Sequence, residues 1–154
     1  MMEDKEKVME TLAKNEEKIS QLYEEYSFKY NEQYNLWFML SSEETAHASW
    51  IRSLKASYAK GSLYVDEKRF KVKTVELFSS YLDEKIKEAK ETDLSLEKAL
   101  GIALDIENSL IEKRWFEAIE ADIAADKMTL DRLKDALQIH RKRIVDAIEA
   151  FQRR

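Results

Sequence analysis

Residues that interrupt helices are almost absent from this chain of 154 residues. It contains no proline and only two glycines, Gly61 and Gly101. Apolar side chains recur at steps of three and four over long segments, the spacing that puts them on one face of an α-helix. Strands are usually separated by turns rich in proline and glycine. We therefore predict an all-α fold in a single domain that covers residues 1–154.

The apolar periodicity predicts four long helices and one shorter helix. The long helices are expected at about residues 3–30, 35–60, 96–122 and 130–151, and the shorter one at about 74–90. The first connection is so brief that the two helices it joins must be antiparallel neighbours. Residues 61–90 can carry the chain from one end of a bundle to the other. The sequence therefore predicts an antiparallel four-helix bundle with a long crossover that carries a short extra helix.

Several helix ends carry recognisable signals. Gly61 can end the second helix in the left-handed conformation, and Ser95 can cap the start of the third. Residues 122–129 are expected to form a short turn, and the charge run at 141–143 a solvated face. We expect the irregular segment after Gly61 to be anchored on the bundle by Leu63, Tyr64, Phe70 and Val72.

The second predicted helix carries Glu44 and His47 inside an apolar stripe that runs from Trp37 to Leu54. A carboxylate and an imidazole three residues apart on one helix face can bind the same metal ion. Taken alone, the stretch is better explained by a hydrogen-bonded core histidine, because glutamate is frequent throughout this chain.

The other predicted long helices extend this pattern. Glu16 and Glu107 lie on the inner stripes of the first and third helices, and His140 lies on that of the fourth. The two halves of the chain correspond, because Glu16 precedes His47 by 31 residues and Glu107 precedes His140 by 33. An ionised carboxylate is costly in a bundle interior unless it is paired or bound to a cation. Glutamates with imidazoles suit iron or manganese, and also zinc.

These residues give the chain a resemblance to the rubrerythrin and ferritin-like di-iron carboxylate family. The resemblance covers about residues 8–148. It rests on Glu16 with Tyr23 seven residues later, on Glu-Glu-x-x-His-Ala in the second helix, on the long crossover, and on Glu107 and His140. It implies a ferritin-like bundle with a metal site made by Glu16, Glu44, His47, Glu107 and His140.

The resemblance also implies how these ligands divide. Glu16, Glu44 and His47 would hold one ion, Glu107 and His140 would hold a second, and Glu44 would bridge them. Tyr23 would hydrogen-bond a ligand carboxylate from outside the ligand shell.

One position departs from the family pattern. The family has a glutamate three residues before the last histidine, where this chain has Leu137. Gln138 lies about 100° further round the helix and cannot take over. Three carboxylates would leave two divalent ions with a net positive charge and one bridging ligand fewer. Two ions, one ion and a metal-free site kept as packing are all compatible with this ligand set. In the metal-free case, Glu44 or Glu107 would hydrogen-bond a histidine and one carboxyl group would be protonated.

The resemblance implies an iron- or manganese-dependent oxidoreductase that reduces peroxide or dioxygen. The chain has no cysteine and hence no rubredoxin segment, so electrons would come from a separate donor protein. The alternative is a non-catalytic ferritin-like bundle that binds metal ions or a protein partner. By analogy with the family, we expect a homodimer.

Composition narrows the partners and the location. The net charge is −5 and basic residues are interspersed with acidic ones, so nucleic acid is not an expected partner. No apolar run approaches the roughly 18 residues of a membrane span. The charged N-terminus does not resemble a secretory signal. Together with the lack of cysteine, these features predict a cytoplasmic protein.

Overall fold

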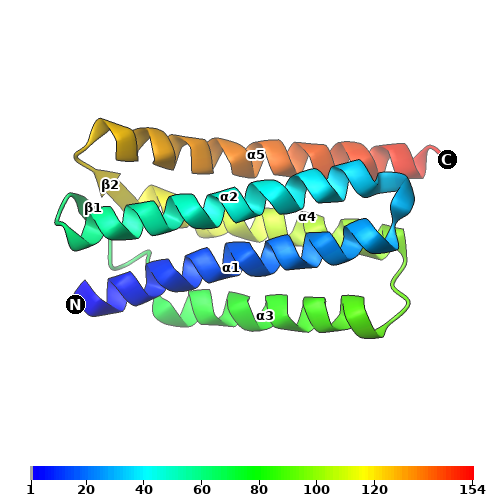
Figure 1. Cartoon of the computed structure of the whole chain (residues 1–154), viewed down its shortest axis with the longest axis horizontal. Helices are drawn as coiled ribbons and strands as arrows, with labels where there is room; N and C mark the ends of the chain where they lie inside the picture. The colour runs from blue at the N-terminus through cyan, green and yellow to red at the C-terminus, as the bar shows by residue number, and fades with distance from the viewer. Residues whose placement is uncertain (1) are drawn as a thin grey trace.

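The computed structural model describes residues 2–154 and confirms the all-α prediction. The chain forms five α-helices and a very small two-stranded sheet in this range (Figure 1). The elements are α1 (Met2–Lys29), α2 (Tyr34–Ala59), β1 (Leu63–Val65), α3 (Val72–Glu91), α4 (Leu96–Lys113), β2 (Ile119–Ala121) and α5 (Ala124–Gln152). Two short 3₁₀ turns, Asn31–Gln33 and Trp115–Ala118, connect neighbouring elements.

The five helices lie side by side with their long axes close to parallel (Figure 1). α1 packs against both α2 and α3, while α5 packs against both α4 and α2. α1 and α2 run in opposite directions, as their short connection predicted. The segment that contains β1 and α3 returns the chain to the opposite end, so α4 runs in the same direction as α2.

A pair of serines joins α1 to α2 and fixes how far the two helices are shifted along each other. Ser20 Oγ donates to the Ser41 carbonyl oxygen and Ser41 Oγ donates to the Ser20 carbonyl oxygen, each at 2.8 Å. Both serines are buried, so these reciprocal bonds satisfy polar groups that would otherwise be costly. Glu16 lies one turn before Ser20 and Glu44 lies about one turn after Ser41. The antiparallel packing therefore places the two carboxylates at the same level of the bundle.

Two of the predicted helix ends are confirmed. Gly61 has a φ of 84°, the left-handed conformation that a glycine adopts at low steric cost. Ser95 Oγ accepts a hydrogen bond from the Lys98 backbone N–H at 3.2 Å, so it caps α4 as expected.

The end of the third long helix was predicted wrongly. α4 ends at Lys113 instead of continuing to residue 122, because Arg114 takes a left-handed conformation with a φ of 53°. The 3₁₀ turn that follows buries Trp115 and Phe116. The next helix begins at Ala124, so the turn expected at 122–129 is also wrong.

The small sheet was not predicted, because its strands pair across a long stretch of sequence. β1 and β2 are antiparallel, with Leu63 opposite Ala121 and Val65 opposite Ile119. Alternation along β1 buries Leu63 and Val65 but leaves Tyr64 64% exposed, so Tyr64 is not the anchor that we expected. Of the other expected anchors, Phe70 is buried and Val72 is partly buried against the core. None of the helices in residues 2–154 combines the length and apolar character that crossing a membrane requires.

Candidate metal centre

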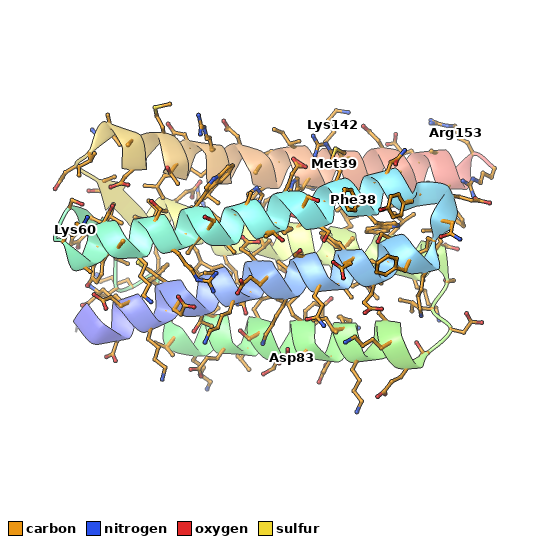
Figure 2. All side chains as sticks on the ribbon, viewed as in Figure 1. Phe38, Met39, Lys60, Asp83, Lys142 and Arg153 are labelled. Atoms are coloured by element: carbon orange, nitrogen blue, oxygen red, sulfur yellow. The ribbon has the colours of Figure 1, made fainter. Side chains whose placement is uncertain are left out.

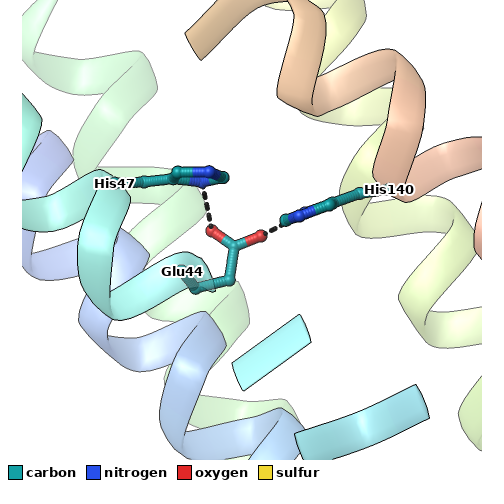
Figure 3. A group of neighbouring side chains, drawn as sticks. All are labelled: Glu44, His47 and His140. Atoms are coloured by element: carbon teal, nitrogen blue, oxygen red, sulfur yellow. Dashed lines mark hydrogen bonds and ion pairs between the residues drawn. The ribbon is translucent and has the colours of Figure 1, made fainter. Parts of the chain in front are cut away.

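Glu44, His47 and His140 come together in the interior, the first two from α2 and the third from α5 (Figure 3). The Glu44 carboxylate lies between the two imidazoles. Its Oε1 is 2.9 Å from His140 Nδ1, and its Oε2 is 3.4 Å from His47 Nδ1. One potential ligand atom from each residue lies within 4.8 Å of the others. A carboxylate oxygen and two imidazole nitrogens in such proximity can hold a metal ion.

The two imidazoles are held against each other and against an indole. Their ring centroids are 5.2 Å apart with an interplanar angle of 25°, and Trp50 lies 5.2 Å from the His47 ring on its own helix. Glu44 and His140 are each 1% exposed and His47 is 4% exposed. The surrounding packing therefore limits rotation of the rings, as a preorganised binding site requires.

The other two predicted ligands, Glu16 and Glu107, are also buried but lie at the edge of this group. Glu107 Oε1 accepts a hydrogen bond from the Tyr23 hydroxyl at 3.0 Å and lies 3.7 Å from His140 Nδ1. Tyr23 thus makes the kind of hydrogen bond to a carboxylate that the resemblance implied. Glu16 interacts with Glu44. The structure therefore brings all five predicted residues to one level of the bundle, with three of them in position to share one ion.

Proton binding differs sharply among the three buried carboxyl groups. Burial and the adjacent Glu44 charge raise the pKa of Glu16 well above its ordinary value, which favours the protonated form of this carboxyl group. Burial also raises the pKa of Glu107, to about 7, with the Glu44 charge adding to the effect. For Glu44, burial is outweighed by hydrogen bonding to Glu16 and His140 and by the nearby His47 imidazole, so its pKa is lowered and it is ionised.

His140 is the positively charged partner of Glu44 in the metal-free protein. Burial by itself lowers the pKa of this imidazole, but hydrogen bonding to Glu107 and Glu44 outweighs it and raises the pKa to about 10. The imidazolium then balances the Glu44 carboxylate. A metal ion that binds His140 at Nδ1 has to displace this proton.

Four buried polar atoms of the site have no hydrogen-bond partner within residues 2–154. They are Glu16 Oε2, Glu44 Oε2, Glu107 Oε2 and His140 Nε2. An unsatisfied buried polar group costs about 1–3 kcal/mol. A cation is a suitable partner for the unpaired Glu44 and Glu107 oxygens, so the centre fits a hard or borderline divalent metal ion.

Leu137, three residues before His140 on α5, is buried. Together with Leu110 and Trp115 it lines a small pocket of about 200 Å³. α5 therefore contributes an imidazole to the centre but no carboxylate.

Sequence reasoning missed Glu43 and Arg143, which flank the centre. Arg143 Nη1 donates to both carboxylate oxygens of Glu43, at 3.0 and 2.6 Å, and Glu43 Oε2 lies 3.7 Å from His140 Nε2. Arg143 is thus a partly buried link between α5 and α2, which corrects its assignment to a solvated face. Its position three residues after His140, on the same helix face, was the signal that could have found it.

Comparisons with protein-family models, curated proteins and solved structures found no match to this chain.

Proposed function

We propose that this protein is a rubrerythrin-like metal-binding protein that holds one iron or manganese ion through Glu44, His47 and His140. The observation that carries the proposal is the placement of two imidazole Nδ1 atoms against the two oxygens of one buried carboxylate. The helix arrangement supports it, because α1, α2, α4 and α5 fit a ferritin-like four-helix bundle with α3 carried on the crossover.

A single ion accounts for the geometry better than a pair of ions. Glu107 accepts a hydrogen bond from Tyr23, and burial beside Glu44 raises the pKa of Glu16 and so favours its protonated form. The fourth carboxylate that would help to balance a second ion is replaced by Leu137. These three residues leave too little negative charge for two divalent ions.

When bound, iron supplies one-electron redox chemistry, and we propose that the reaction is the reduction of peroxide or dioxygen. Reduction of hydrogen peroxide to two waters takes up two electrons and two protons. The chain has no cysteine to hold a rubredoxin-type donor, so the electrons come from a separate protein. Glu107, with a pKa of about 7 and a hydrogen bond from Tyr23, can hold a proton beside the centre.

Two adjacent glutamates provide a matched test of the metal site. Glu44→Gln replaces the central carboxylate, while Glu43→Gln makes the same change at its partly exposed neighbour. The metal content of the purified chain, measured after growth with iron and manganese, should be about one ion per chain. We expect Glu44→Gln to lose this ion and Glu43→Gln to retain it. Equal metal content in the two variants, or none in the parent after anaerobic addition of ferrous iron, would overturn the proposal.

An exposed apolar cluster favours a second function, protein association. Phe28, Phe38 and Met39 are 66%, 53% and 40% exposed, close to the connection between α1 and α2, and Tyr34 stacks on Phe38. Phe38 and Met39 lie on the outer side of α2 (Figure 2). Exposed apolar clusters often mark interaction surfaces. A homodimer formed there should dissociate in Phe38→Glu but not in Leu77→Glu, which changes a residue on α3 that is 63% exposed. Sedimentation velocity distinguishes the two results.

A further inference from the structure

A pocket of about 420 Å³ lies between α2 and α5, against the outer edge of the two imidazoles. Its apolar wall is formed by Ala46, Trp50, Ala136 and Ile139. Small-molecule sites in proteins have volumes of roughly 300–1,000 Å³ and are lined mainly by apolar and aromatic side chains with a few polar groups. The pocket meets this description in both its size and its lining.

The polar atom that marks the pocket as a binding site is His140 Nε2. The opposite edge of the His140 ring, with Nδ1, faces Glu44, so Nε2 is directed toward the side where Glu43 and the pocket lie. The His140 side chain is 1% exposed, and among the described residues Nε2 makes no hydrogen bond, because its contact with Glu43 Oε2 is 3.7 Å long. A ligand hydroxyl group can act as donor or acceptor, so it satisfies Nε2 whichever role this nitrogen takes.

The charged groups around the pocket do not select an ion. Arg143 is paired with Glu43 through contacts of 3.0 and 2.6 Å. Arg132 and Asp135, which also line the pocket, carry opposite charges. The formal charges of these four side chains cancel, and the charge of His140 is balanced by Glu44, which lies 2.9 Å from its Nδ1. A neutral ligand therefore avoids the cost of removing an ion from water.

We propose that this pocket binds a small neutral molecule with an apolar, ring-sized body and one hydroxyl group, such as an alcohol or a phenol. The apolar body packs on Trp50 and Ile139, and the hydroxyl group hydrogen-bonds to His140 Nε2. This binding goes beyond the proposed metal function and does not require it, so it can be measured on the metal-free chain.

Benzyl alcohol, toluene and benzoate test the proposal, because the three share one carbon skeleton. The chain has three tryptophans, and only Trp50 lines the pocket, while Trp37 and Trp115 are buried. In a ¹H–¹⁵N spectrum of the full chain, we expect benzyl alcohol to shift the Trp50 indole signal saturably and to leave the other two in place. Toluene lacks the hydroxyl group and should bind roughly tenfold more weakly. Benzoate should also bind more weakly than benzyl alcohol. The absence of a saturable Trp50 shift, equal shifts of all three indoles, or tighter binding of benzoate would each overturn the proposal.

Filling the pocket provides a second test. Ala46→Phe places a ring in the pocket and should abolish the Trp50 shift, whereas Ala56→Phe makes the same change at an exposed position on the same helix. If Ala46→Phe does not fold, Ala136→Leu is the second variant. It fills the pocket from α5 and should weaken the binding of benzyl alcohol. Undiminished benzyl alcohol binding in a folded pocket variant would contradict the proposal. Metal content measured on the same samples reports separately on the metal centre.

Discussion

Glu44 Oε1 and His140 Nδ1 lie 2.9 Å apart although the two residues are 96 positions apart in the sequence. Both side chains are 1% exposed. The contact joins α2 to α5 and pairs an ionised carboxylate with an imidazolium away from water. In the metal-free protein, the proton on His140 supplies positive charge at the place where we propose that a metal ion binds.

This proton makes the stability of the metal-free protein depend on pH. The pKa of His140 is raised from 6.5 to about 10, so the folded chain binds the proton more tightly than the unfolded chain. The free energy of unfolding should therefore fall as the pH rises from about 6.5 to about 10, by up to about 5 kcal/mol, because a difference of one pKa unit corresponds to about 1.4 kcal/mol. Urea unfolding across this range measures the slope. His140→Gln should flatten it, and an unchanged slope in that variant would assign the effect to other groups.

Metal binding should have the opposite dependence on pH. An ion that binds His140 Nδ1 releases a proton. Below the His140 pKa, the Kd for Mn²⁺ should therefore fall about tenfold for each unit by which the pH rises. Competition with a chelator at pH 6.5 and 7.5 provides the two Kd values. Calorimetry in buffers of different ionisation enthalpy should show about one proton released per ion. A Kd that does not change with pH would rule out Nδ1 of His140 as a ligand.

Comparison of two buried tyrosines on α1 distinguishes the contribution of a hydrogen-bonded hydroxyl group to stability from that of the aromatic ring. The Tyr23 hydroxyl donates to buried Glu107, whereas the buried Tyr26 hydroxyl has no hydrogen-bond partner within the described residues. Tyr23→Phe should lower the free energy of unfolding by about 1–3 kcal/mol, because Glu107 loses a donor. Tyr26→Phe should change it by less than about 0.5 kcal/mol. Thermal or urea unfolding measures both values. Equal effects would show that the hydrogen bond from Tyr23 to Glu107 does not contribute to stability.

Leu137→Glu adds a carboxylate to the last helix, three residues before His140. We expect the number of metal ions per chain to rise from about one toward two, because the added charge helps to balance a second ion. The metal-free variant should be less stable by about 2 kcal/mol or more, since it buries a charged group. Gln138→Glu is the control, because Gln138 is exposed and points elsewhere on the helix. An increase in metal content in both variants would point to surface binding.

Local patterns were sufficient to predict most of the helices and the direction of their inner faces. The periodicity of apolar residues depends only on positions three and four apart, so the burial of Glu44, His47 and His140 could be read before any tertiary contact was known. The caps at Gly61 and Ser95 are equally local.

Long-range packing decided the features that local patterns missed. The strands at 63–65 and 119–121 form only because they pair with each other, and α4 stops at Lys113 because Arg114 turns left-handed before a buried 3₁₀ turn. No three- or four-residue spacing in the sequence encodes these events.

The same distinction applies within the metal centre. Helix periodicity predicts that Glu44 and His140 point inward, but it does not predict that their side chains are in contact. That contact depends on how α5 packs against α2, as does the link from Arg143 to Glu43 beside it. The residue types and their inner faces follow from the amino-acid order, because a helix forms through local contacts. The pairing of ligand atoms follows from the tertiary fold, because it depends on the relative position of helices far apart in the chain.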